Sequence, residues 1–246
     1  MTHQRNLLAS ILLLASSFVH AQDGADTASK AVNQLFEDYF EKSLERAPLL
    51  ATFIGDHRYD DRLTNYISPS HIALALDVER RYLDAAMKYD PQRLSPQDRL
   101  SWEIFVGERR TAIAGAQFKS EWLPLDQMSS FATLMPVLAS ATNAQPFDTV
   151  EDYDEFLARM DDYIVLSDQA ITNMREGVRH RIVQPHVVME KVLAQLTELI
   201  ADDPAKSLYY QPILQFPENF SAADRARLES DYRKAIAGQI TPAYRR

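Results

Sequence analysis

The sequence predicts an all-α protein, and three observations support this prediction. Apolar residues recur every three or four positions through several long stretches, which places them on one face of a helix. Only 6 of the 246 residues are glycine, so few residues suit the tight turns of β-hairpins. Apart from Asp23-Gly24, no Asp-Gly or Asn-Gly hairpin pair occurs, and no alternating strand pattern of convincing length is present. We therefore expect an irregular multi-helix domain.

The first 21 residues have the pattern of a secretory signal peptide. Arg5 precedes an apolar run over residues 7–19, and Val19-His20-Ala21 offers small residues for peptidase cleavage. The run is shorter than the roughly 18–20 apolar residues that a membrane span requires. We expect cleavage after Ala21 and an exported chain without a membrane span. Because the sequence contains no cysteine, it predicts neither a lipoprotein anchor nor disulfides, which suits a Gram-negative type of periplasm.

Serine and proline mark the helix ends predicted in the first half of the chain. Residues 22–28 are small and polar and are expected to be flexible, so that the helical domain covers residues 29–246. A first amphipathic helix ends before Pro48. Ser68-Pro69 and Ser95-Pro96 each combine a capping serine with a first-turn proline, and they predict the starts of two further helices.

The second half begins with a less regular region. Three prolines interrupt an apolar stretch there, and we expect loops with one short helix. Beyond it, Thr149 and Asp152 form the Thr-x-x-Asp pattern of a capping box and predict a helix that continues past Gly177. Pro185 opens another helix, and Ser221 caps the last one.

The apolar stripe of this last helix continues almost to the end of the sequence. Its members are Leu228, Tyr232, Ala235, Ile236 and Ile240. A chain truncated at its C-terminus, within a larger helical domain, would have this pattern. If the covering helices belong to a missing C-terminal half, these large side chains are expected to be exposed, at about 1.5–3 kcal/mol each relative to burial.

Composition excludes several classes of function. The net charge is −9 and no basic tract occurs, so the chain is not expected to bind nucleic acid. Without cysteine there is no thiol nucleophile, zinc ribbon or iron–sulfur cluster. The sequence also lacks a P-loop, a Gly-x-Gly-x-x-Gly motif, a Gly-x-Ser-x-Gly elbow and a His-Glu-x-x-His zinc helix.

The densest polar cluster lies between Gly55 and Arg62. Functional groups often lie on loops that a rigid scaffold holds, and a histidine beside a carboxylate can act as an acid or base. His57, Asp60, Asp61 and Arg62 are therefore candidates for the lining of a cleft. The alternative interpretation is a solvated loop with internal ion pairs. No residue of the chain is predicted to be catalytic.

One weak metal-binding pattern is present. His186 and Glu190 are four residues apart and share a helix face, but a third ligand would have to come from elsewhere. A first-turn histidine beside a surface glutamate is the simpler interpretation, and we expect no tightly bound zinc in this chain. Tyr209-Tyr210 could line a groove, although core packing is the simpler interpretation for this pair and for Trp102 and Trp122.

Several segments together resemble one bacterial family. The sequence from Ala47 to His57, followed by Asp60-Asp61-Arg62-Leu63, resembles the start of the domain-of-unknown-function family 885 (DUF885). The later segments that are similar to the family, in the same order, are Glu151-Asp152-Tyr153, Leu157-Ala158-Arg159-Met160, Met174-Arg175-Glu176-Gly177-Val178, Gln184-Pro185 and Pro242-Ala243-Tyr244. The resemblance covers essentially the whole mature chain.

This resemblance implies a larger protein. Members of the family are considerably longer and look like helical zinc metallopeptidases with peptide-like substrates. Their C-terminal half carries a His-Glu-x-x-Pro-Gly-His segment, in which the histidines would bind zinc and the glutamate would activate water. This sequence contains no such segment, so none of those residues carries over to any position here.

Two functional hypotheses follow. In the first, the chain is the N-terminal, non-catalytic portion of an exported zinc-metallopeptidase-like hydrolase. It forms part of the wall of the substrate cleft, and its partner is the missing C-terminal half, which holds the zinc. In the second, the chain is a stand-alone periplasmic helical module for binding or scaffolding, without catalysis. The reading frame beyond Arg246 separates them, because only the first hypothesis predicts the His-Glu-x-x-Pro-Gly-His segment there.

Overall fold

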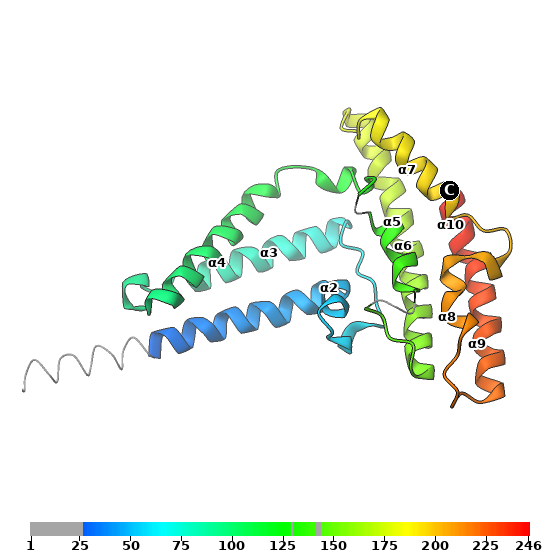
Figure 1. Ribbon diagram of the computed structural model, residues 1–246. Helices are drawn as coiled ribbons and strands as arrows, with labels where there is room; N and C mark the ends of the chain where they lie inside the picture. Colours follow the sequence, from blue (N-terminus) through cyan, green and yellow to red (C-terminus); the bar gives the residue numbers. More distant parts are fainter. Residues whose placement is uncertain (1–26, 129, 141–143) are drawn as a thin grey trace, which may run out of the picture. The chain divides into compact units, whose positions relative to one another are not determined.

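The computed structural model describes residues 27–128, 130–140 and 144–246, and every regular element in these ranges is a helix (Figure 1). The all-α prediction is therefore confirmed. The predicted signal peptide, residues 1–21, lies outside the described residues. Of the segment predicted to be flexible, residues 22–28, only Thr27 and Ala28 are described, and both already belong to a helix.

The chain divides into two compact units that are discontinuous in sequence. Of the described residues, the first contains 27–42 and 73–118, and the second contains 43–72, 119–128, 130–140 and 144–246. Each unit has its own set of buried side chains and is described separately below.

Three long helices supply the first unit. One covers residues 27–46, of which 27–42 belong to this unit. The others are α3 (Pro69–Ala86), whose residues from 73 onward belong to it, and α4 (Pro96–Gly115). A 3₁₀ turn, η2 (Pro91–Arg93), lies between α3 and α4. Both helices begin with proline as the sequence predicts, because its fixed φ suits the first turn of a helix.

The core of the first unit is small and rich in aromatic residues. Arg109 is buried at its side, where the guanidinium carbon lies 3.9 Å from the centroid of the Tyr39 ring. Glu79 pairs with Arg109 and accepts a 2.8 Å hydrogen bond from the Tyr39 hydroxyl. Trp102 is half-buried against this core, as expected. The buried apolar residues of the cluster are Ala86, Phe105 and Val106.

The second unit begins with two short elements. A helix, α2 (Pro48–Phe53), leads through Gly55 into a 3₁₀ turn, η1 (His57–Tyr59). Gly55 has a φ of +85°, a conformation that glycine adopts without the strain that a Cβ would bring. The chain can therefore reverse sharply here and place η1 close to α2.

The longest helix, α6 (Val150–His180), organises the second unit. It begins with the predicted capping box, in which the Thr149 hydroxyl accepts from the Asp152 amide at 3.2 Å and the Asp152 carboxylate accepts from the Thr149 amide at 2.7 Å. The irregular region before it contains the 3₁₀ turn η3 (Ser120–Trp122) and one short helix, α5 (Phe131–Leu138), as the prolines indicate.

The remaining elements follow α6 in the second unit, where α9 and η6–α10 pack along it (Figure 1). The predicted helix after Pro185 is α7, and the helix capped by Ser221 is α9. A π-helical turn continues α9 directly into α10. In order they are α7 (His186–Glu198), η4 (Pro204–Lys206), η5 (Leu208–Tyr210), α8 (Gln211–Leu214), α9 (Ala222–Ala235), η6 (Ile236–Ile240) and α10 (Thr241–Arg245).

The apolar stripe of the last helix is covered by this chain itself, so the expectation of its exposure is wrong. Leu228, Tyr232 and Ile236 are 0% exposed and Ile240 is 1% exposed. They belong to the main core, together with the buried face of α6. The Tyr232 hydroxyl also donates to the carbonyl of Tyr153 on α6 at 3.0 Å. A stripe that continues to the last residues can thus be buried by helices earlier in the sequence.

Buried tyrosines complete the core of the second unit. Tyr209 and Tyr210 are 1% and 4% exposed, which confirms core packing rather than a groove. The hydroxyls of Tyr209 and Tyr244 lie 2.9 Å apart, and Tyr244 donates to the carbonyl of Ala132 at 2.6 Å. Trp122 is half-buried. Among the described residues, no helix is both long and apolar enough to cross a bilayer.

Candidate functional site

The polar loop after α2 is held against α6 by a buried arginine. Arg159 and Asp60 are both 0% exposed, and the Arg159 Nη2 atom lies 3.2 Å from the Asp60 Oδ1 atom. Asp60 follows η1, while Arg159 lies on the face of α6 that carries Phe156 and Tyr163 into the core. The sequence prediction identified Asp60 but missed Arg159.

Every nitrogen of the Arg159 guanidinium has an acceptor. Nε donates to the carbonyl of Arg62 at 3.1 Å, and Nη1 donates to the side-chain oxygen of Gln145. Nη2 faces the carbonyl of Tyr59 at 3.1 Å and the Thr52 hydroxyl at 2.6 Å, in addition to Asp60. A buried charge with this many partners fixes the loop in one geometry.

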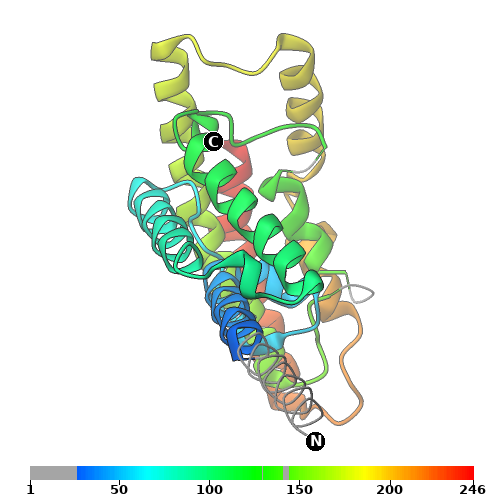
Figure 2. The same ribbon diagram turned by 90° about the vertical axis from the view of Figure 1, so that its left-hand side faces the viewer.

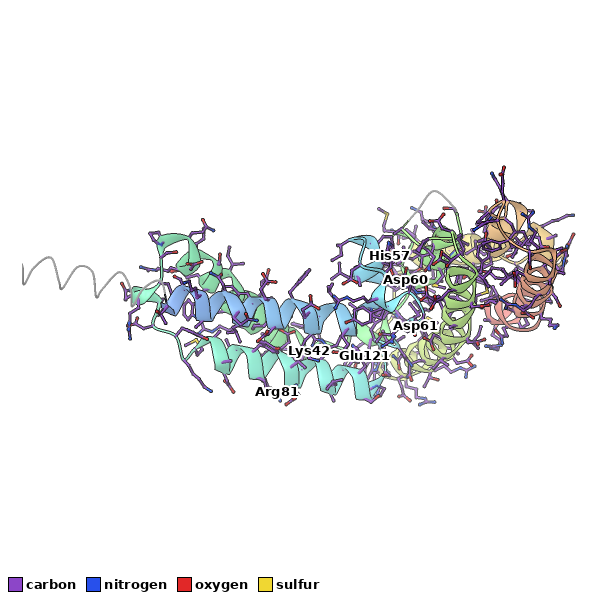
Figure 3. All side chains as sticks on the ribbon, turned by 90° about the horizontal axis from the view of Figure 1, so that it is seen from below. Lys42, His57, Asp60, Asp61, Arg81 and Glu121 are labelled. Atoms are coloured by element: carbon purple, nitrogen blue, oxygen red, sulfur yellow. The ribbon has the colours of Figure 1, made fainter. Side chains whose placement is uncertain are left out.

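The two oxygens of the buried Asp60 carboxylate have different partners. Its Oδ1 atom contacts Arg159 and the Thr52 hydroxyl, which lies within α2. Its Oδ2 atom lies 2.7 Å from the Nδ1 atom of His57, whose side chain is 48% exposed (Figure 3). Because a carboxylate can only accept, Nδ1 carries the hydrogen, and Nε2 is the acceptor nitrogen of the neutral ring.

The charges in this network influence each other. Burial lowers the pKa of the Arg159 guanidinium, and the neighbouring Asp60 carboxylate opposes that shift. Arginine nevertheless stays protonated, because its ordinary pKa is far above neutrality. Burial raises the pKa of Glu155, one helical turn before Arg159, and the charge of Asp60 raises it further. Among the described carboxylates, Asp60 is the one that the Arg159 guanidinium contacts, at 3.2 Å.

The other candidates of the loop lie at the surface. Asp61 and Arg62 pair with each other at 2.9 Å, with side chains 48% and 49% exposed. Asp56 caps η1 and also pairs with Arg58 at 2.6 Å. For these four residues the solvated-loop interpretation holds. For Asp60 it does not, because its carboxylate is buried.

The sequence signal that could have identified Arg159 is a charged residue on an apolar helix stripe. Arg159 follows Phe156 by three positions and precedes Tyr163 by four, so it shares their helix face. A lone arginine at such a position needs a buried acceptor. Apart from Gln145, its partners are about a hundred residues away in sequence, and no local spacing identifies them.

The weak metal-binding pair is present but open to solvent. His186 Nδ1 lies 3.6 Å from Glu190 Oε1 on α7, and the two side chains are 88% and 64% exposed. Within residues 27–128, 130–140 and 144–246, no group of three histidine, aspartate or glutamate side chains is arranged to hold a metal ion.

The fold and this network define an all-α protein in which a histidine-bearing loop is bonded to the longest described helix through Arg159. The chain belongs to the family described as "Bacterial protein of unknown function (DUF885)", whose model matches residues 48–246. The resemblance seen in the sequence is thereby confirmed.

A solved structure shows the same fold within a longer chain. It is a "putative lipoprotein" from Colwellia psychrerythraea, with a TM-score of 0.73 and 12% sequence identity. The match covers 89% of this chain and 40% of that chain, so this chain spans about 40% of the length of the protein it matches. No curated protein matches the chain.

Proposed function

We propose that this chain is the N-terminal, non-catalytic portion of an exported hydrolase of the zinc-metallopeptidase type, and that it forms part of the wall of the substrate cleft. The structural match carries this proposal, because nearly all of this chain corresponds to less than half of the related protein. The sequence resemblance supplies the type of hydrolase and the peptide-like substrate. The N-terminal signal pattern and the description of the Colwellia protein as a lipoprotein support export.

Zinc belongs to the remainder of the protein in this proposal. The donor groups described here do not fit a zinc site, since His57 and Asp60 bind each other and His186 has only Glu190 beside it. The chain itself would contribute shape and hydrogen bonds to the cleft. Its missing partner would be the segment that carries His-Glu-x-x-Pro-Gly-His.

The loop from Gly55 to Arg62 is the part of the wall that touches substrate. The Asp60–Arg159 network fixes the His57 ring through Nδ1 and leaves Nε2 to accept a hydrogen bond from a peptide N–H. A donor or acceptor that is already oriented loses little entropy when substrate binds. His57 would therefore position a peptide-like substrate without taking part in bond cleavage.

The first test reads the gene beyond the codon for Arg246, in frame and after one frameshift. An encoded His-Glu-x-x-Pro-Gly-His segment supports the proposal. A stop codon with no such segment nearby contradicts it and favours the stand-alone module.

The second test uses the protein that includes this segment and measures peptide hydrolysis. His57→Ala should raise KM and lower kcat/KM about tenfold, the effect of losing one hydrogen bond to substrate, and leave the zinc content unchanged. His186→Ala is the matched control, because this exposed histidine on α7 should leave kcat/KM unchanged. Equal kcat/KM values for the two variants would show that His57 does not contact the substrate.

One observation favours the second candidate, a stand-alone binding or scaffold module. The stripe from Leu228 to Ile240 is covered within this chain, so it does not require a further partner for burial. Under this candidate the same His57 loop would be the binding surface. The gene test above decides between the two.

A further inference from the structure

An apolar pocket of about 150 Å³ lies in the second unit at the turn between α6 and α7. This turn is at the upper end of both helices in Figure 2. Val178, in the pocket wall, is roughly 28 Å along α6 from Arg159, so the pocket is separate from the His57 loop. The larger apolar side chains of the lining are Trp122, Leu125, Met174, Val178, Ile182 and Met189.

Close contacts join the segments that form the pocket. The position of Gly177 on α6 leaves no room for a side chain, because a Cβ there would be 2.5 Å from the carbonyl oxygen of Ile182 and 3.2 Å from that of Trp122. The Trp122 ring also stacks on His180, with centroids 4.7 Å apart and planes inclined by 17°. The loop that carries Trp122 is therefore packed tightly against the end of α6.

The lining of the pocket is uncharged. Among the described residues that line it, none is charged, and Gln184 is the one with a polar amide. The Nε2 atom of Gln184 donates to the carbonyl of Leu125 at 3.2 Å, so it already has an acceptor. A charged ligand would lose its hydration on entry and find no counter-charge in these walls. The lining therefore favours a neutral, apolar ligand.

The volume limits the size of that ligand. A cavity of about 150 Å³ with apolar walls stays dry and accommodates one molecule the size of benzene. Because the pocket is already formed in the chain without a ligand, few side chains must be ordered when a molecule enters.

The surroundings of the pocket favour a free molecule over the side chain of a protein partner. Exposed residues of both charges, Arg179, Arg181 and Glu190, directly adjoin lining residues in sequence. The buried centre of a protein interface is depleted of charged residues. A free small molecule can enter the pocket without covering these charges.

We propose that this pocket is a binding site for one small, neutral, apolar molecule, such as an aromatic ring of the size of benzene or toluene. The site goes beyond the proposed function and does not rest on it. Burial of the ring against the apolar walls supplies the affinity.

The two tryptophans provide the experiment, because Trp122 lines the pocket and Trp102 lies in the first unit. The ¹⁵N-labelled chain is titrated with toluene, and the two indole N–H signals are followed by NMR. The Trp122 signal should shift and saturate while the Trp102 signal stays in place. Benzoate and benzylammonium carry the same ring with a negative or a positive charge, and each should bind at least tenfold more weakly than toluene.

Two exposed valines of α6 give matched variants, since Val178 and Val165 are 66% and 57% exposed. Val178→Asp places a carboxylate in the pocket wall and should weaken toluene binding at least tenfold. Val165→Asp makes the same change roughly 20 Å away along the helix and should bind toluene as the unaltered chain does. Circular dichroism checks that both variants keep their helix content.

Four results would overturn the proposal. The first is no saturable shift of Trp122 with toluene, and the second is equal binding of toluene and either charged analogue. The third is equal affinity of the two valine variants for toluene. The fourth is a Trp122 signal that broadens with protein concentration in the absence of toluene, which would mean that a second copy of the chain fills the pocket.

Discussion

Asp60 and Arg159 form an ion pair in which both side chains are completely buried. Such pairs add little net stability, because the loss of hydration offsets the attraction between the charges. Their effect here is geometric, since they set the position of His57. The sequence indicated the loop through its density of charges, but it could not indicate that Asp60 alone points inward. That distinction depends on Thr52 and Arg159, which pack over it from two helices.

Replacing Arg159 by methionine should destabilise the protein by about 3–5 kcal/mol, because it leaves the Asp60 carboxylate buried without its counter-charge. Urea denaturation followed by circular dichroism measures the loss. Arg227→Met is the matched control, since Arg227 forms an exposed pair with Asp154 at 2.7 Å and should lose only about 0–1 kcal/mol. Similar small losses in both variants would show that Asp60 is solvated.

Tyr153 should make stability fall at high pH. Burial raises the pKa of its hydroxyl from 10.0 in the unfolded chain to about 12. Below pH 10 the hydroxyl is protonated in both states, and this contribution to stability is complete. As the pH rises from 10 to 12, the unfolded chain releases the proton while the folded chain keeps it, so stability declines.

Denaturant unfolding at a series of pH values measures this decline. Tyr153→Phe cannot ionise, so its stability should fall less steeply over that range. At neutral pH the Tyr153→Phe variant should be less stable than the unaltered protein by about 1 kcal/mol, because it loses the hydrogen bond to the carbonyl of Pro212. Parallel curves for the two proteins would contradict the assignment. The remaining slope would come from Tyr209, Tyr232 and Tyr244, whose pKa values burial also raises.

At the scale of elements, α6 shows both the strength and the limit of sequence patterns. Its start was predicted from Thr149 and Asp152, because a capping box is a local arrangement of two side chains. Its end was predicted only as lying past Gly177. The helix stops at Arg181, which adopts a left-handed conformation with φ 60° where glycine is usual. Nothing in the residue type indicates this conformation. It lets the Ile182 amide donate to the carbonyl of Gly177 at 2.8 Å.

Gly177→Ala should loosen the α6–α7 turn. The new methyl group would lie 2.5 Å from the carbonyl oxygen of Ile182, so the turn must shift, and we expect a loss of about 1–3 kcal/mol. Gly107→Ala in α4 is the contrasting variant, because its Cβ meets nothing within 4 Å and alanine favours a helix by about 0.5–1 kcal/mol. Thermal unfolding should therefore shift in opposite directions. A stabilised Gly177→Ala variant would contradict the close approach.

At the scale of the whole molecule, burial is distributed unevenly between the two units. The first unit buries Ala86, Phe105 and Val106 in its aromatic cluster, whereas the main core of the second unit includes most of the apolar residues of α6, α9 and η6. The sequence predicts one domain over residues 29–246, and local patterns cannot show the division. Each unit combines segments from separate parts of the chain, so only contacts between distant residues define it.

This difference in burial predicts that native-state hydrogen exchange will give different opening free energies for the two units. Amides of α3 and α4 should open at a lower free energy than those of α6, because fewer apolar side chains must be exposed. The segment from Leu228 to Ile240 should be protected as strongly as α6, since its stripe lies in the same core.

Two core variants test whether the units open separately. Phe105→Ala should remove about 3–5 kcal/mol from the opening free energies of α4 and leave those of α6 unchanged. Leu228→Ala should remove about 2–5 kcal/mol from the opening free energies of amides in α6 and α9. Amides in α4 should lose protection only if they exchange through an opening that also unfolds the second unit. If either variant lowers protection equally in both units, they unfold as one cooperative body, and the division of the core would have no thermodynamic counterpart.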